Sequence, residues 1–256
     1  MEHTVLVTGA TSGFGEAIAR RFLANGHQVI AAGRRLERLE ALKASLPAEQ
    51  QKKLLNIVLD VCDSAMVEAL PATLPADFSK VTILVNNAGL ALGLEPSHKA
   101  FLEDWDRMID TNIKGLVHMS RAFLPGMVER KLGHVINIGS VAANYPYPGG
   151  NVYGGTKAFV KQFSLNMRAD LIGTPLRVSC IEPGMCGGTE FSNVRFKGDD
   201  EKVQKVYSGV QFLSADDIAE AVYWTASLPA YMNINVLEVM PVQQSFNPMN
   251  IHRGEL

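Results

Sequence analysis

The sequence predicts an α/β fold in which a doubly wound parallel sheet of about seven strands carries helices on both faces. Short β-branched runs alternate with amphipathic helical segments, and this alternation implies parallel strands joined by right-handed crossovers. Nearly every strand run is apolar at successive positions, as in a sheet covered on both faces. The 256 residues contain neither an internal repeat nor a low-complexity linker, so we expect one domain over 1–256.

Each element has its own signal. Strands are expected over short apolar runs, at residues 4–7, 28–32, 54–60, 81–86, 135–139, 177–181 and 236–240. Helices are expected where apolar residues recur at helical spacing, at residues 15–25, 36–45, 64–70, 105–130, 153–172 and 216–227. Two segments lack clear periodicity, an insert over about 184–209 and a tail over about 243–256. An irregular insert of this length is usually a functional lid or a mobile loop.

Composition excludes several classes of protein. With 24 Lys+Arg against 26 Asp+Glu and 47% hydrophobic residues, the chain suits neither a disordered protein nor a nucleic-acid binder that relies on positive charge. No apolar stretch approaches the roughly 18 residues of a membrane span, and no export signal is evident. Three cysteines and six histidines show no metal-type spacing. We therefore expect a cytoplasmic protein without a metal site.

A glycine-rich turn, TGATSGFG at residues 8–15, separates the first strand from the first helix. Small residues let the backbone approach a pyrophosphate, and the N–H groups of the following helix point at that anion. The glycine spacing is not GxGxxG, so a plain strand–helix turn remains the alternative. The turn predicts dinucleotide contacts by Gly9, Thr11, Ser12, Gly13, Phe14 and Gly15.

The second strand ends at Gly33-Arg34-Arg35, where NAD sites usually carry an acid for the ribose 2′-hydroxyl. Guanidinium groups suit a 2′-phosphate instead, which predicts NADP(H). The alternative is that both arginines only solvate a loop. Asp60 ends the third strand beside Val61, where its carboxylate could accept a hydrogen bond from the adenine amino group.

Tyr153 and Lys157 lie four residues apart on a predicted helix, which places their Cβ atoms about 5–6 Å apart on one face. A nearby ammonium stabilises the phenolate and lowers the tyrosine pKa from about 10, so the tyrosine could act as acid or base nearer neutral pH. Ser140 follows the fifth strand, at the edge of the sheet where ligands bind. The Tyr-x-x-x-Lys spacing alone is common by chance.

In combination, these motifs resemble the single-domain short-chain dehydrogenase/reductase family over essentially the whole chain. The matching residues, in order, are TGATSGFG at 8–15, Asn-Asn-Ala-Gly at 86–89, Asn112, Ser140, Tyr153 with Lys157, and Pro183-Gly184. The resemblance implies a Rossmann fold that forms one NADP-binding oxidoreductase domain. It adds further expected cofactor contacts, namely Asn87, Ala88, Gly89, Tyr153, Lys157, Pro183, Gly184 and Thr189.

The same resemblance implies roles for the polar residues. Ser140 would orient the substrate carbonyl, and Tyr153 would donate the proton. Lys157 would bind the nicotinamide ribose and tune the tyrosine. Asn112 would hold a water that links the lysine to solvent.

A narrower resemblance lies in GGTEFSNVRFKGDD at 187–200, together with residues 86–93 and 149–153. These segments are similar to the bacterial NADP-dependent 3-hydroxy acid dehydrogenases, which also oxidise serine and allo-threonine and reduce malonic semialdehyde. A related branch reduces sulfoacetaldehyde to isethionate. The resemblance implies a small anionic aldehyde or hydroxy acid as substrate and leaves carboxylate or sulfonate open, with slight preference for the carboxylate.

Arg195, in the expected lid, is the natural receptor for either anion, while Ser140, Tyr147, Tyr153 and Met185 are expected to line the substrate pocket. The alternative for Arg195 is an ion pair with Asp199 or Asp200. A further donor for a sulfonate could come from Asn144, Asn151 or the tail.

Two other functions share the fold. A 3-oxoacyl carrier-protein reductase would need an open pocket and a basic docking patch, which the slightly acidic balance disfavours. A non-catalytic NADP-sensing regulator would be expected to lack the tyrosine or the lysine. The helices at 105–130 and 153–172 are apolar beyond one face, including Phe159 and Phe163, which favours a homotetramer over a dimer.

Overall fold

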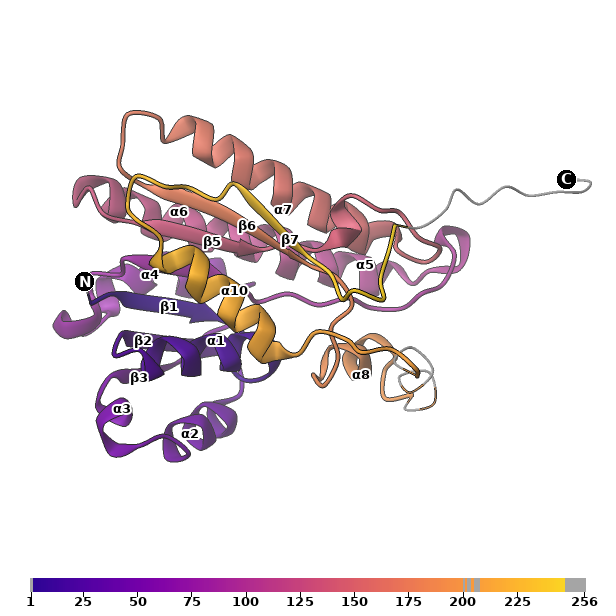
Figure 1. The fold of residues 1–256 in the computed structure, drawn as a ribbon, viewed down its shortest axis with the longest axis horizontal. Coiled ribbons are helices and arrows are strands. Elements are labelled where there is room, and N and C mark those ends of the chain that lie inside the picture. Colours follow the sequence, from indigo (N-terminus) through magenta and orange to yellow (C-terminus); the bar gives the residue numbers. More distant parts are fainter. Residues whose placement is uncertain (1, 200, 202–203, 205–207, 247–256) are drawn as a thin grey trace, which may run out of the picture.

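Seven parallel strands form one sheet in the order β3-β2-β1-β4-β5-β6-β7 (Figure 1). The computed structural model describes residues 2–199, 201, 204 and 208–246. The remainder of the expected lid (200, 202–203, 205–207) and tail (247–256) lies outside the described residues. The strands are β1 (Thr4–Thr8), β2 (Gln28–Gly33), β3 (Leu54–Val58), β4 (Ile83–Asn86), β5 (His134–Ile138), β6 (Arg177–Pro183) and β7 (Val236–Val239). The predicted fold class is confirmed.

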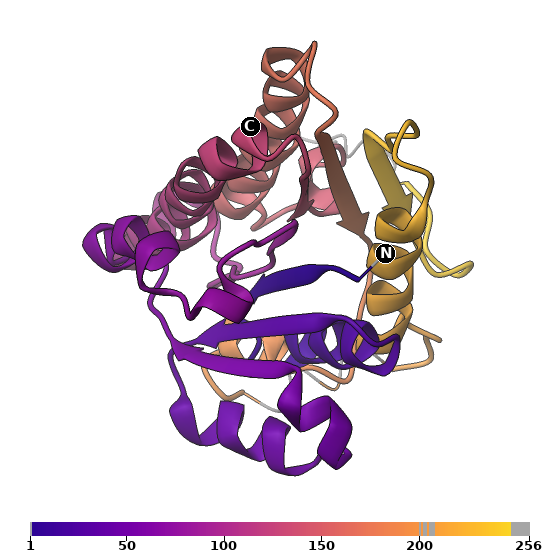
Figure 2. The ribbon, with the colours of Figure 1, turned by 90° about the vertical axis from the view of Figure 1, so that its left-hand side faces the viewer.

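Helices cover both faces of the sheet, because alternate residues of each strand point to opposite sides. Val5 and Val7 of β1 pack under one set of helices, α1 (Gly13–Ala24), α2 (Leu36–Ala44) and α10 (Ala215–Ser227). Leu6 packs under the other set, α4 (Ser64–Thr73), α6 (Leu116–Glu129) and α7 (Asn151–Asp170). The two layers are visible on either side of the sheet in Figure 2. Short helices α3 (Ala48–Lys52) and α8 (Phe191–Arg195) were not expected.

The helix expected over 105–130 is three consecutive segments. α5 (Leu102–Ile109) continues into a π-helical segment, η3 (Asp110–Gly115), and then into α6. A Cβ on Gly115 would lie 2.7 Å from Val61 Cγ2, so glycine allows this segment to pack closely against the end of β3. π-Helical turns often occur at functional sites. Within the described residues, no helix combines the length and apolar character needed to cross a membrane.

The winding of the sheet reverses between β1 and β4, which are direct neighbours. In open α/β sheets, ligands bind beyond the carboxyl ends of the strands at such a point. Thr8 joins the two strand ends, because its Oγ1 accepts hydrogen bonds from the backbone N–H groups of Asn87 and Ala88, both at 3.0 Å. The Asn87 side chain donates back to the Thr8 carbonyl at 2.8 Å.

Candidate active site

A cleft of about 720 Å³ lies at the carboxyl ends of the strands, within the size range of sites for cofactors and small molecules. The side on which the cofactor is expected (the cofactor side) is lined by Gly9 and residues 11–14, 33–35, 59–61 and 87–89. The side on which the substrate is expected (the substrate side) is lined by Ser140, Tyr147, Tyr153, Met185 and Arg195. Apart from Gly15 and Asn112, every predicted site residue lines this cleft.

The glycine-rich turn is shaped by the absence of side chains. Gly9 and Gly13 have φ angles of +67° and +54°, which side chains with a Cβ rarely adopt. A Cβ on Gly15 would press on the Gly9 carbonyl oxygen and lie 2.6 Å from Asn87 Nδ2, so Gly15 supports the turn from below. Ser12 is the N-cap of α1 but makes no side-chain capping bond, which leaves the N–H groups of the first turn available to an anion. These features fit a dinucleotide pyrophosphate.

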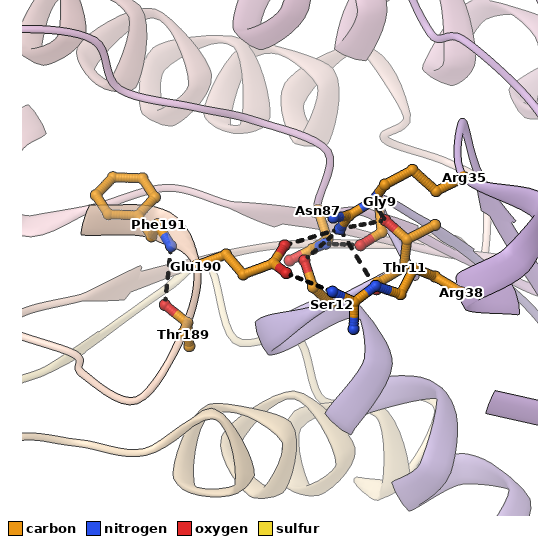
Figure 3. A network of polar contacts seen from close by, with 9 residues as sticks. All are labelled: Gly9, Thr11, Ser12, Arg35, Arg38, Asn87, Thr189, Glu190 and Phe191. Atoms are coloured by element: carbon orange, nitrogen blue, oxygen red, sulfur yellow. Dashed lines mark hydrogen bonds and ion pairs between the residues drawn. The ribbon is translucent and has the colours of Figure 1, made fainter. Parts of the chain in front are cut away.

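Arg35 contacts the glycine-rich turn and does not merely solvate a loop. Its guanidinium donates to Thr11 Oγ1 at 3.1 Å and to Ser12 Oγ at 3.0 Å (Figure 3). It also pairs with Glu190 at 2.9 Å, and Arg38 pairs with the same carboxylate at 3.2 Å. Glu190 was missed, because no pattern in the sequence relates it to an arginine 155 residues away.

One wall of the cleft brings together three of the predicted residues, Ser140, Tyr153 and Lys157. Ser140 follows β5 and caps η4 (Val141–Ala143), its Oγ accepting from Ala142 N at 3.1 Å. Tyr153 and Lys157 are both buried on α7, with Lys157 Nζ 5.9 Å from the centre of the tyrosine ring. The ammonium donates to the Ile138 carbonyl at 2.8 Å, which fixes its position at the end of β5.

The expected lowering of the tyrosine pKa is wrong for this arrangement. Burial raises the pKa of Tyr153 to about 12, while the hydrogen bond to Ser140 and the charge of Arg195 act in the opposite direction. Burial also lowers the pKa of Lys157 to about 8. Desolvation penalises both charged forms and here outweighs the attraction expected from the i, i+4 spacing. At neutral pH Tyr153 therefore carries its proton.

Asn112 lies in the π-helical segment, is buried, and is not among the described residues that line the cleft. Its Oδ1 accepts from Leu90 N and its Nδ2 donates to Leu90 O, both at 2.9 Å. The same Nδ2 donates to Thr156 Oγ1 at 3.0 Å. The side chain thus ties the segment after β4 to the helix that carries Tyr153 and Lys157.

Arg195 is the last residue of α8 and reaches into the substrate side. Its Nε donates to the Gly93 carbonyl at 3.2 Å and its Nη2 to Tyr147 Oη at 2.9 Å. Its Cζ lies 5.7 Å from the centre of the Tyr153 ring. Both acceptors are neutral oxygens. The alternative ion pair, with Asp199 or Asp200, stays a prediction, because Asp200 lies outside the described residues and the contact of Asp199 is not defined within them.

Of the further donors considered for a sulfonate, two residues in the described part of the tail are at the cleft. Gln244 and Ser245 line it, and Gln244 Oε1 accepts from Met185 N at 2.6 Å. Asn144 instead donates to Glu182 and Glu238, at 2.8 and 2.9 Å. Asn151 Oδ1 accepts from Trp105 Nε1 at 3.1 Å, so neither asparagine is among the described residues that line the cleft.

A doubly wound sheet, an uncapped glycine-rich turn and a buried Ser–Tyr–Lys group define a dinucleotide-dependent oxidoreductase. The chain belongs to the short-chain dehydrogenase family, whose model matches residues 3–200. It is 63% identical over 250 residues to the NADP-dependent 3-hydroxy acid dehydrogenase YdfG of Salmonella typhi, with 98% of this chain and 99% of that protein covered.

Two further comparisons agree. The chain is 52% identical over 253 residues to the serine 3-dehydrogenase of Agrobacterium fabrum, with 99% of each protein covered. A solved structure described as the closed form of serine dehydrogenase complexed with NADP+ superposes with a TM-score of 0.94 at 61% identity. That match covers 98% of this chain and 99% of the other.

Proposed function

We propose that this protein interconverts short 3-hydroxy acids, such as serine or 3-hydroxypropionate, and the corresponding anionic aldehydes of the malonic semialdehyde type. It is an NADP-dependent oxidoreductase, in keeping with its 63% identical relative and with the NADP+ complex that it resembles. The observation that carries the substrate proposal is the position of Arg195, a lid cation that reaches both Tyr147 and Tyr153.

The cofactor side suits NADP(H). The open first turn of α1 and the glycines at 9 and 13 would receive the pyrophosphate. Arg34 and Arg35 would receive the 2′-phosphate, and Asp60 the adenine amino group. When bound, NADPH supplies the hydride for reduction, and NADP+ accepts one in the reverse oxidation.

On the substrate side, Tyr153 carries the proton that an aldehyde oxygen requires as it becomes an alcohol. The Ser140 hydroxyl is hydrogen-bonded to Tyr153 in the substrate-free site; with an aldehyde bound, it would instead donate to the aldehyde oxygen and stabilise the charge that develops on it. Lys157 keeps an ammonium close to the tyrosine ring from its anchor on the Ile138 carbonyl. In the oxidation direction Tyr153 must lose its proton, which its raised pKa opposes.

Arg195 holds the anion of the substrate. Its acceptors among the described residues, a carbonyl and a phenol, carry no charge, so a carboxylate that enters the cleft forms a stronger, charge-assisted hydrogen bond. Tyr147 keeps the guanidinium above Tyr153, which places the anion a short distance from the reacting carbonyl. A two- or three-carbon aldehyde spans such a gap.

The test is NADPH oxidation with malonic semialdehyde and with sulfoacetaldehyde, compared by kcat/KM. We expect the carboxylate substrate to be preferred. A clear preference for sulfoacetaldehyde would identify an isethionate-forming reductase and direct attention to Gln244 and Ser245, the tail residues at the cleft. Activity with neither aldehyde would refute the assignment of Arg195.

A further inference from the structure

Glu190 places a carboxylate on the residues that would receive the 2′-phosphate. Its two oxygens pair with Arg35 at 2.9 Å and Arg38 at 3.2 Å, and it also hydrogen-bonds Ser12 (Figure 3). Arg35 itself donates to Ser12 and Thr11 of the glycine-rich turn. The Arg35 guanidinium and the Ser12 hydroxyl therefore already bind a carboxylate of the protein itself.

The carboxylate comes from the lid and not from the cofactor-binding half of the sheet. Glu190 is the N-cap of α8. Its neighbour Thr189 lies directly over the turn, since a Cβ on Gly13 would be 3.3 Å from Thr189 Cβ. The lid therefore rests on the cofactor side at two adjacent residues, and one of them supplies a negative charge.

A carboxylate and a phosphate compete for the same hydrogen-bond donors of Arg35. Both accept charge-assisted hydrogen bonds from the guanidinium, and the donors that point at Glu190 are not available to a second anion at the same time. The 2′-phosphate brings more negative charge and more acceptor oxygens than a carboxylate, so it can take these donors over. NADH carries a hydroxyl at that position, and this neutral group cannot displace the Glu190 carboxylate.

We propose that Glu190 is a specificity-determining residue for the cofactor, a built-in anion that occupies the Arg35 site and competes with the 2′-phosphate of NADP(H) but not with NAD(H). The inference rests on the proposed role of Arg35 as a 2′-phosphate ligand. Its consequence is that the cofactor preference of the enzyme is smaller than its arginines alone would give. A second consequence is that NADP(H), and not NAD(H), releases the cofactor-side anchor of the lid.

The test is the binding of NADPH and NADH to the substrate-free enzyme, followed by nucleotide fluorescence. Both side chains of the Arg35–Glu190 pair are 39% exposed, and exposed ion pairs are weak. We therefore expect Glu190→Gln to tighten NADPH binding by about two- to fivefold and to leave NADH binding unchanged. Glu190→Asp retains the charge and should stay closer to the parent enzyme. The matched control is Glu49→Gln, which removes the carboxylate of a surface ion pair with Lys52 and should change neither affinity.

A double-mutant cycle with Arg35→Ala separates this inference from the proposed function. If Glu190 acts through Arg35, the gain from Glu190→Gln disappears in the Arg35→Ala background. Unchanged or weaker NADPH binding by Glu190→Gln, or an equal gain for NADH, would overturn the inference while leaving Arg35 as a phosphate ligand. Equal loss of NADPH and NADH binding in Arg35→Ala alone would overturn the assignment of Arg35 itself.

Discussion

On the cofactor side of the cleft Arg35 is met by a carboxylate, whereas on the substrate side Arg195 is met by a carbonyl and a phenol. Glu190 and Arg195 stand at opposite ends of the same five-residue helix, α8. With the proposed roles of these residues, cofactor binding exchanges one anion for another at Arg35, whereas Arg195 offers a cation to the anion of the proposed substrate. α8 thus presents a negative charge toward the proposed 2′-phosphate site at one end and a positive charge toward the proposed substrate site at the other.

The two sides also differ in what builds them. The cofactor side depends on backbone turns and on glycines that pack against strand ends, such as Gly9 and Gly15. The substrate side depends on side chains from α7, the lid and the loops after β4 and β5, brought together across large sequence separations. Changes on the substrate side should therefore affect chemistry and substrate affinity, and changes in the turn should affect stability and cofactor affinity.

The largest effect is expected for Tyr153→Phe, which removes the proposed proton donor and keeps the buried ring. Loss of general acid catalysis costs about 10²–10⁴-fold in rate, so kcat should fall to the limit of detection. Binding of NADPH should be unaffected, since the phenyl ring still fills the same space. The measurement is kcat together with a fluorescence titration of NADPH; substantial residual turnover would show that another group donates the proton.

Arg195→Ala should have the next largest effect. It tests whether Arg195, unlike the carboxylate-paired Arg35, acts by binding the anion of the substrate. Loss of a charge-assisted hydrogen bond costs about 1.5–3 kcal/mol, so KM for an anionic aldehyde should rise about 10- to 100-fold, with little change for a neutral aldehyde. Lys197→Ala is the matched control, because that lid cation pairs with Asp104 at 2.8 Å and lies 58% exposed. Equal effects on charged and neutral aldehydes would make Arg195 a structural residue of the lid.

The pH dependence of the reduction tests Lys157 on the same side. Its pKa is lowered to about 8 by burial, and that of Tyr153 is raised to about 12. Both groups are protonated below pH 8, and the lysine loses its charge first as the pH rises. For aldehyde reduction, kcat/KM should be level from about pH 6 to 7 and fall by up to about tenfold per pH unit above about 8. A profile that stays level through pH 9 would show that the lysine charge is not required.

The sequence predicts local features of the site better than contacts between distant segments, for a physical reason. The glycine-rich turn and the Tyr153–Lys157 spacing are local patterns, and local patterns determine local geometry. The pairing of Glu190 with Arg35, and the contact of Arg195 with Gly93, join residues more than a hundred positions apart, which no single-sequence pattern encodes. The direction of the Tyr153 pKa shift was mispredicted for a related reason, because spacing gives proximity to Lys157 but not the burial of both groups.

The smallest effect is expected from the substitution of a glycine. Two glycine variants distinguish a position where a side chain does not fit from one where glycine only adds backbone flexibility. In Gly15→Ala the new Cβ would press on the Gly9 carbonyl oxygen and lie 2.6 Å from Asn87 Nδ2; overpacking of this kind costs about 1–3 kcal/mol. We expect a lower Tm and weaker NADPH binding. Gly155→Ala is the control, since nothing lies within 4 Å of the position that a Cβ would take there. Alanine stabilises a helix interior by about 0.5–1 kcal/mol relative to glycine. Thermal unfolding of both variants measures the contrast. If Gly15→Ala is as stable as the parent enzyme, the turn can move away from Asn87, and the cofactor side is less rigid than its close contacts imply.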